Sequence, residues 1–376
     1  MTVLSGLALA AASATVPIPP PDPLGYPVPV EILRGLSYLT LTLHFLAMSF
    51  TLGGVLLLLL VKLVRKPGQE SVSRYLATSL PLGFSYLVTL GVPPLLFVQV
   101  TYGQLFYSSS VIMASYWLHV IPLLVVAYGL LYLNKLTGSH RVTVQRVSLA
   151  VALASMLSIG FIYVNNLTLA QSPAQWADLY AANTMGRGLN LAEPTLWPRF
   201  TLFLSPSLAV AGLGLLVAAA VVRRRGRSEE AAPFVRLGTR SLLGGFVLHT
   251  AGLVWTVASL PPEIRALATA GGLPTLLLAA AVGLELVAVA LALATAARGG
   301  LAGPVVSAVL VALSLACVVV VRDLLRIQVL APFWSADSIP VHPQWGMFGI
   351  FAASLVAGLV LLVVFTVKVV RNLSRG

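Results

Sequence analysis

The chain has 376 residues, of which 58% are hydrophobic and 9% charged, and its mean hydropathy is +0.96. Soluble globular domains carry about a quarter of their residues as charged side chains, so this composition excludes that class and indicates a polytopic membrane protein. The single cysteine, Cys317, excludes an internal disulfide and a cysteine-rich iron–sulfur site.

Apolar stretches long enough to cross a bilayer recur along the whole chain. They predict an all-α membrane helix bundle of about nine spans. A proline-rich arm over residues 1–32 precedes this bundle, which is one domain over residues 33–376. The first four spans fill 33–169, an outer loop fills 170–199, and the last five spans fill 200–368. The predicted spans are 33–62, 78–100, 111–134, 147–169, 200–222, 241–260, 273–296, 303–325 and 343–368.

Basic residues lie mainly after every second span, beginning with Lys62, Arg65 and Lys66 after the first. The positive-inside rule makes these segments cytoplasmic, so we expect a periplasmic amino terminus and a cytoplasmic carboxyl terminus. The net charge of +12 is thus a topology signal, and we expect no nucleic-acid partner. The stretch VLSGLALAAASA has the small-residue tail of a signal peptide but no preceding Lys or Arg. We therefore expect a retained arm, with a cleaved signal as the alternative.

Three histidines, His44, His119 and His249, fall within separate predicted spans at similar depth in the outer half of the bilayer. Ionisable side chains in hydrocarbon are costly and mark functional sites by default. Imidazoles at matched depth suit the axial positions of a haem iron. The alternatives are hydrogen bonds between helices and a copper or zinc site. His140 and His342 are expected in a solvated loop and at the outer surface, respectively.

Other charged residues interrupt the apolar sequence. Glu285, in LLLAAAVGLELVAVAL, is a candidate proton relay, or simply a hydrogen-bonding group between helices. Arg322 and Arg326 share a helix face at i, i+4 spacing. They suit the carboxylates of haem propionates, and snorkelling to the interface is the alternative.

Three segments resemble the haem-bearing large subunit of cytochrome bd-type quinol oxidases. LTLHFLAMSFTLGG is similar to the first span of that family, and His44 falls on the histidine that binds its oxygen-reducing haem. GVPPLLFVQVTYGQLFYSSS resembles the second span, whose Phe-Gly-x-x-Trp element is replaced here by residues 102–106. LSIGFIYVNNLTLAQSPAQW resembles the end of the fourth span. Asp323 and Arg326 keep an acid-x-x-Arg spacing of the family, and the nine-span layout also agrees.

Departures from the family pattern change the function that the resemblance implies. The family's haem-facing glutamate falls on His119, so one haem would gain two imidazoles and lose its open position for oxygen. The second haem's histidine and methionine are replaced at residues 200–202 and at Ala281, and the quinol loop shrinks to residues 261–272. His249 has no counterpart in the family and is a candidate ligand of a second haem.

These observations predict a divergent member of the family, acting as a b-type haem subunit of a respiratory complex in the bacterial inner membrane. It would pass electrons between the quinone pool, menaquinone or ubiquinone, and a periplasmic c-type cytochrome, within a complex of further subunits. The alternatives are a bd-like terminal oxidase subunit and a haemless membrane anchor. The candidate site residues are His44, His119 and His249 for one or two haems b, Arg322 and Arg326 for propionates, Glu285 for protons, and Gln99, Tyr102 and Gln104 for quinone.

Overall fold

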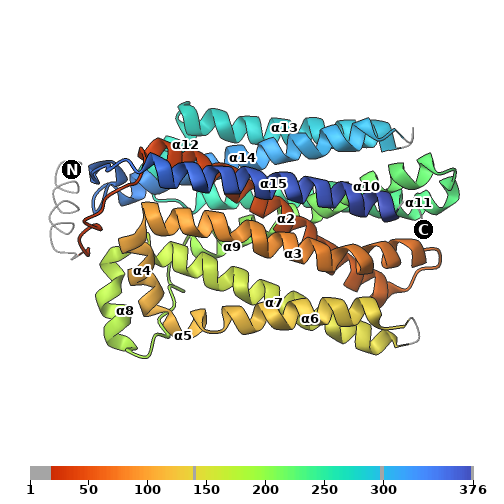
Figure 1. Ribbon diagram of the computed structural model, residues 1–376, viewed down its shortest axis with the longest axis horizontal. Helices are drawn as coiled ribbons and strands as arrows, with labels where there is room; N and C mark the ends of the chain where they lie inside the picture. The colour runs from red at the N-terminus through yellow and green to blue at the C-terminus, as the bar shows by residue number, and fades with distance from the viewer. Residues whose placement is uncertain (1–17, 139–140, 297–299, 374–376) are drawn as a thin grey trace.

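The computed structural model describes residues 18–138, 141–296 and 300–373 (Figure 1). Within these ranges nine helical segments are long and apolar enough to cross a membrane, and no β-strand forms. The chain is therefore an all-α, multi-pass membrane protein, as its composition predicts. The longer helices are α2 (Val30–Val64), α3 (Glu70–Thr101), α6 (Val120–Leu136), α7 (Val142–Leu169), α10 (Pro206–Arg224), α11 (Ser228–Ala258), α13 (Leu273–Ala296), α14 (Ala302–Leu330) and α15 (Trp345–Leu373).

Short helices precede or interrupt several spans. The third is broken, because α5 (Ala114–Trp117) ends before His119 and α6 begins after it. The fifth is broken at Ser205, since Pro206 has no backbone N–H to donate and starts a new helix, α10, after α9 (Leu196–Leu204). The remaining short helices are α4 (Gly103–Ile112), α8 (Trp176–Ala182), α12 (Pro262–Thr269) and the 3-10 turns η1 (Pro173–Gln175) and η2 (Ala336–Ser338).

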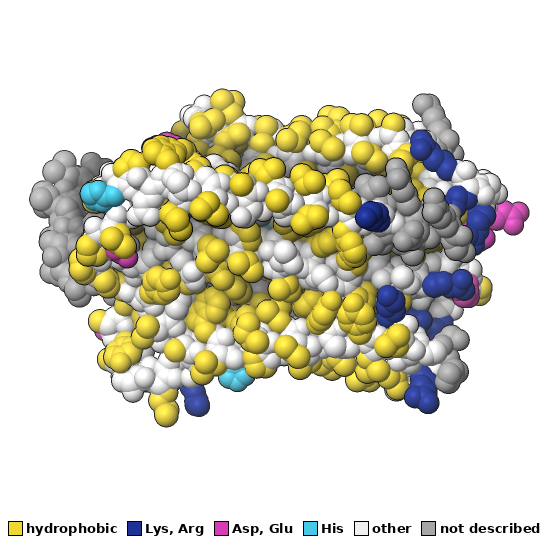
Figure 2. All heavy atoms as spheres, in the orientation of Figure 1, with side chains coloured by type: hydrophobic (Ala, Val, Ile, Leu, Met, Phe, Trp, Pro, Cys, Tyr) yellow, Lys and Arg dark blue, Asp and Glu magenta, His cyan; other side chains and the backbone are white. Residues whose placement is uncertain are grey.

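Lysines and arginines gather at one end of the molecule (Figure 2), as the alternation of basic segments predicts. We call this the basic end; it carries the termini of α2 and α10, with Lys62, Arg65, Arg223 and Arg224. At the other end, the loop end, lie α4, α8 and α12 (Figure 1). There, the described part of the proline-rich arm is fixed to the bundle, because Tyr26 N donates to Pro340 O at 2.8 Å.

Small residues allow the central helices to approach closely. A Cβ on Gly53 of α2 would lie 2.0 Å from the carbonyl oxygen of Ser207 in α10. A Cβ on Gly245 of α11 would lie 2.2 Å from the backbone nitrogen of Ala209. Close backbone contact of this kind stabilises helix pairs in lipid, where apolar burial gives little driving force. As a result, α10 packs on both α2 and α11 and lies between them.

Candidate functional site: a cavity lined by histidine and arginine

A cavity of about 490 Å³ lies within the bundle, toward the loop end. Its walls come from α2, α3, α4, α6, α7, α9, α10, α11, α13 and α14, and most of its lining side chains are apolar. Volumes of this size accommodate cofactors and drug-sized ligands. The basic side chains that line it are His44, His249, Arg199, Arg322 and Arg326.

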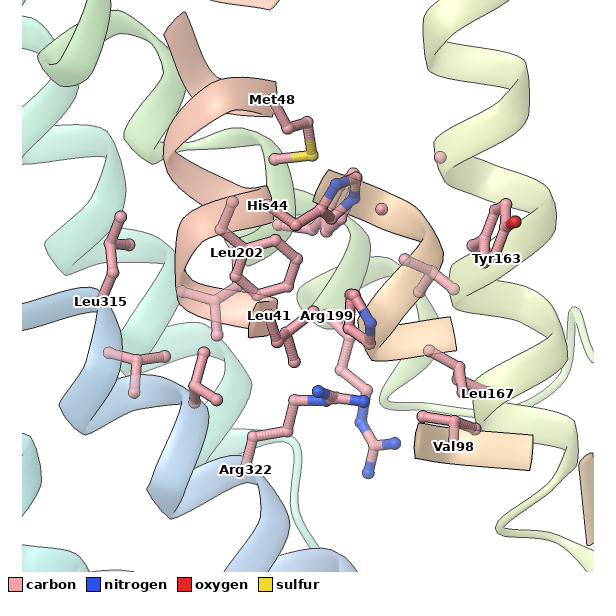
Figure 3. A pocket seen from close by; sticks show the side chains of 18 of the residues that line it. Leu41, His44, Met48, Val98, Tyr163, Leu167, Arg199, Leu202, Leu315 and Arg322 are labelled. Carbon is pink, nitrogen blue, oxygen red and sulfur yellow. The ribbon is translucent and has the colours of Figure 1, made fainter. Parts of the chain in front are cut away.

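One ring nitrogen of His44, in α2, forms a hydrogen bond with the backbone. Its Nδ1 lies 3.1 Å from the carbonyl oxygen of Leu87 in α3. Because a carbonyl only accepts, Nδ1 carries the hydrogen and Nε2 keeps its lone pair. Gly91 makes room for the ring, since a Cβ there would lie 2.9 Å from His44 Cε1. The imidazole lines the cavity (Figure 3) and is equipped to bind a metal centre through Nε2.

Two arginines from different helices reach the same part of the cavity (Figure 3). Arg199 of α9 donates from Nη1 to Gln171 Oε1 at 3.0 Å, whereas Arg322 of α14 makes no hydrogen bond or ion pair with another described residue. The two lie close enough for their charges to interact. Like charges repel strongly in an apolar environment, so the pair favours an anionic ligand between them.

Arg326 also lines the cavity, but its guanidinium is already paired. It forms an ion pair with Asp323 and lies over the ring of Tyr102, 3.7 Å from the centroid. Asp323 also accepts from Tyr38 Oη at 2.6 Å and from Tyr102 Oη at 3.2 Å. Burial raises the pKa of Tyr102, which keeps the phenol neutral and able to donate. This changes which two arginines are expected to hold propionates. Arg326 is already paired with Asp323, so the two available arginines at the cavity are Arg322 and Arg199.

His249 and Glu285, two separate candidates in the sequence, form a buried pair. His249 Nδ1 of α11 lies 2.6 Å from Glu285 Oε1 of α13, and Ser314 Oγ of α14 donates to the same oxygen at 3.2 Å. The exposed fractions are 1% for His249 and 4% for Glu285. His249 is one of the residues that line the cavity.

His119 does not join His44. Its side chain is exposed on the outside of the bundle, its Nδ1 lies 2.7 Å from Ser115 O of the preceding turn, and it does not line the cavity. The expectation that His44 and His119 flank one iron is therefore not compatible with this arrangement. The reason is the break between α5 and α6: His119 N donates to Tyr116 O, three residues back, and this tighter turn changes the direction of the ring.

The other sequence candidates do not form a second site. Gln99, Tyr102 and Gln104 do not line the cavity, and Tyr102 is committed to Asp323. His342 is exposed, and its backbone N–H donates to Tyr26 O, while His140 lies outside the described residues. Among the described residues, no group of three or more His, Cys, Asp or Glu is placed to hold a metal ion by itself.

Sequence reasoning missed Arg199 and Tyr38. Arg199 lies in LWPRFTLFL at the start of an apolar segment, where an arginine is usually an interfacial residue that snorkels to water. Pro198, directly before it, is compatible with the first turn of a helix but does not indicate that the guanidinium reaches a cavity. Tyr38 is 285 residues from Asp323 in the chain, and nothing local indicates that they meet.

Comparison with known proteins gives no family to which these residues can be matched. No protein-family model matches the chain, and no curated protein matches it either.

Proposed function

We propose that this protein is a b-type haem membrane subunit of a respiratory electron-transfer complex, divergent from the cytochrome bd-type large subunit. One observation carries the proposal. A membrane-embedded apolar cavity contains both an imidazole with Nδ1 engaged, His44, and two arginines from separate helices, Arg199 and Arg322.

The residues of the cavity fit haem b in three respects. The apolar walls suit a porphyrin, and His44 Nε2 suits its iron. The two arginines suit a ligand with two carboxylates, which would relieve their mutual repulsion. When bound, haem b supplies reversible one-electron chemistry. The chain would bind it through His44, hold its carboxylates through Arg199 and Arg322, and exclude water with its apolar side chains.

The proposed setting is the bacterial inner membrane, with the basic end in the cytoplasm by the positive-inside rule. The cavity lies toward the loop end, which would then face the periplasm. This favours exchange of electrons with a periplasmic c-type cytochrome on one side of the reaction and with menaquinone or ubiquinone on the other. Further subunits would complete the complex.

Spectroscopy of the purified, detergent-solubilised chain tests this function. We expect a reduced-minus-oxidised spectrum of b type in the wild type, a lost or clearly altered haem spectrum in His44→Ala, and a wild-type spectrum in His119→Ala. Both substitutions remove one imidazole, so His119→Ala is the matched control. No haem in the wild type would contradict the proposal and favour the haemless anchor.

A bd-like oxidase subunit is the second candidate, and the position of His119 favours it. The imidazole of His119 does not reach the cavity, so it would not be a second ligand of the iron. Without a second protein ligand the iron would stay open to oxygen, whereas a second ligand from another side chain would favour electron transfer alone. Carbon monoxide binds strongly to reduced five-coordinate haem. Strong binding by the wild type would therefore favour the oxidase.

A further inference from the structure

Stability alone does not account for the buried His249–Glu285 pair. Replacing a buried ionic or polar pair by packed hydrophobic residues is often neutral or stabilising. Yet His249, Glu285 and Ser314 come from three helices, α11, α13 and α14, and converge at one carboxylate oxygen. His249 is among the residues that line the same cavity as His44.

We propose that His249 is the second axial ligand of the haem bound by His44, with Glu285 and Ser314 as its positioning residues. This inference rests on the proposed haem function. It replaces the expected His44–His119 pair with His44–His249. His249 then binds the same haem as His44 and not a second one.

The hydrogen bonds of the two rings support this pairing. Each imidazole engages Nδ1 with an oxygen acceptor: a backbone carbonyl for His44 and a carboxylate for His249. With both Nδ1 atoms donating, both Nε2 atoms keep a lone pair for a metal. Metal-binding histidines nearly always donate their other ring N–H to a carboxylate or carbonyl, which fixes the tautomer and the ring orientation.

The two histidines also lie at similar depth. Phe45, next to His44, packs edge to face on Phe203 of α9, with ring centroids 5.5 Å apart. A Cβ on Gly252, about one turn from His249, would lie 3.4 Å from the Cα of Leu202. Residues close in sequence to both histidines therefore contact the same stretch of α9, Leu202 and Phe203, which places the two histidines at comparable depth.

The packing of α2 and α11 on one helix limits how far apart the two histidines can be. Because α10 packs on both α2 and α11, the axes of those two helices are at most about 20 Å apart, two interaxial distances of up to about 10 Å. On α14, Ser314 and Arg322 are eight residues apart, or about 12 Å along the helix. Arg322 is therefore about two helical turns along α14 from the cluster of His249, Glu285 and Ser314.

Charge explains what Glu285 adds beyond orientation. A carboxylate that accepts from an axial imidazole makes the ring more basic and stabilises the oxidised iron. Removing that negative charge should therefore raise the midpoint potential while leaving the imidazole bound.

Three variants of the purified chain test the inference: His249→Ala, Glu285→Gln, and the control Glu263→Gln at the start of α12. Haem content, electron paramagnetic resonance and carbon monoxide binding are measured for each, together with a redox titration. We expect a low-spin bis-imidazole signal in the wild type and the control. His249→Ala should keep haem but become high-spin and bind carbon monoxide, and Glu285→Gln should stay low-spin with a higher midpoint potential.

The outcomes separate this inference from the function on which it rests. A low-spin signal that survives in His249→Ala, or a potential unchanged in Glu285→Gln, would overturn the ligand assignment while leaving haem binding intact. If His249→Ala does not fold, Glu285→Gln decides, since it retains a polar side chain of the same size. Wild-type protein that binds haem and is already high-spin also overturns it, and wild-type protein without haem overturns both proposals.

Discussion

Replacement of Arg322 by alanine should weaken haem binding while making the haem-free protein more stable. Arg322 has no ion-pair partner among the described residues and faces the charge of Arg199. A hydrogen bond to a charged group contributes about 1.5–3 kcal/mol. Loss of one such bond to a propionate corresponds to a haem affinity lower by on the order of 10- to 150-fold.

The substitution should increase the stability of the haem-free protein because it relieves the repulsion between the two arginines. Removal of Arg322 takes away one of the like charges near Arg199 in the apolar cavity, so the haem-free variant should unfold at a higher temperature than the haem-free wild type. The assay pairs the rate of haem transfer to excess apomyoglobin with thermal unfolding of both forms. Arg187→Ala, which removes an exposed arginine outside the cavity, is the control. Haem retention equal to that of the control would refute the proposed carboxylate site.

Two further substitutions test the supports of the site. Gly91→Ala places a Cβ 2.9 Å from His44 Cε1 and should displace the ring, so we expect a loss of haem absorbance. The matched control is Gly129→Ala on α6, where an added Cβ would have nothing within 4 Å. Equal spectra for the two variants would contradict the placement of His44. Asp323→Ala leaves Arg326 buried without its ion-pair partner and should lower the free energy of unfolding by about 3–5 kcal/mol. An unfolding temperature unchanged in that variant would show that the pair is not buried.

The spans were predictable because hydropathy and bilayer thickness fix them. All nine predicted spans overlap the nine candidate spans of the structure. Their ends differ where polar helix continues past the apolar stretch: α11 begins at Ser228 rather than at residue 241, with Glu229 and Glu230 in its first turn. Acidic residues stabilise a helix amino terminus through its dipole, a feature that a hydropathy window does not detect.

The candidate site was predictable in its residue types and only partly in its pairings. His44, His249, Glu285 and Arg322 stand out because ionisable groups are rare in apolar spans, and each lies at or beside the cavity. Which of them meet depends on helix rotation and neighbours. A change of helical phase at His119 removes it from the cavity, and no local pattern in the sequence indicates that change.

The central claim is that the chain binds haem b within the bundle, and the pyridine haemochrome spectrum of the purified wild-type protein measures this directly. The account predicts haem b in an amount equal to that of the protein. Protein that is folded and pure but carries no haem b after expression with ample haem supply would contradict it.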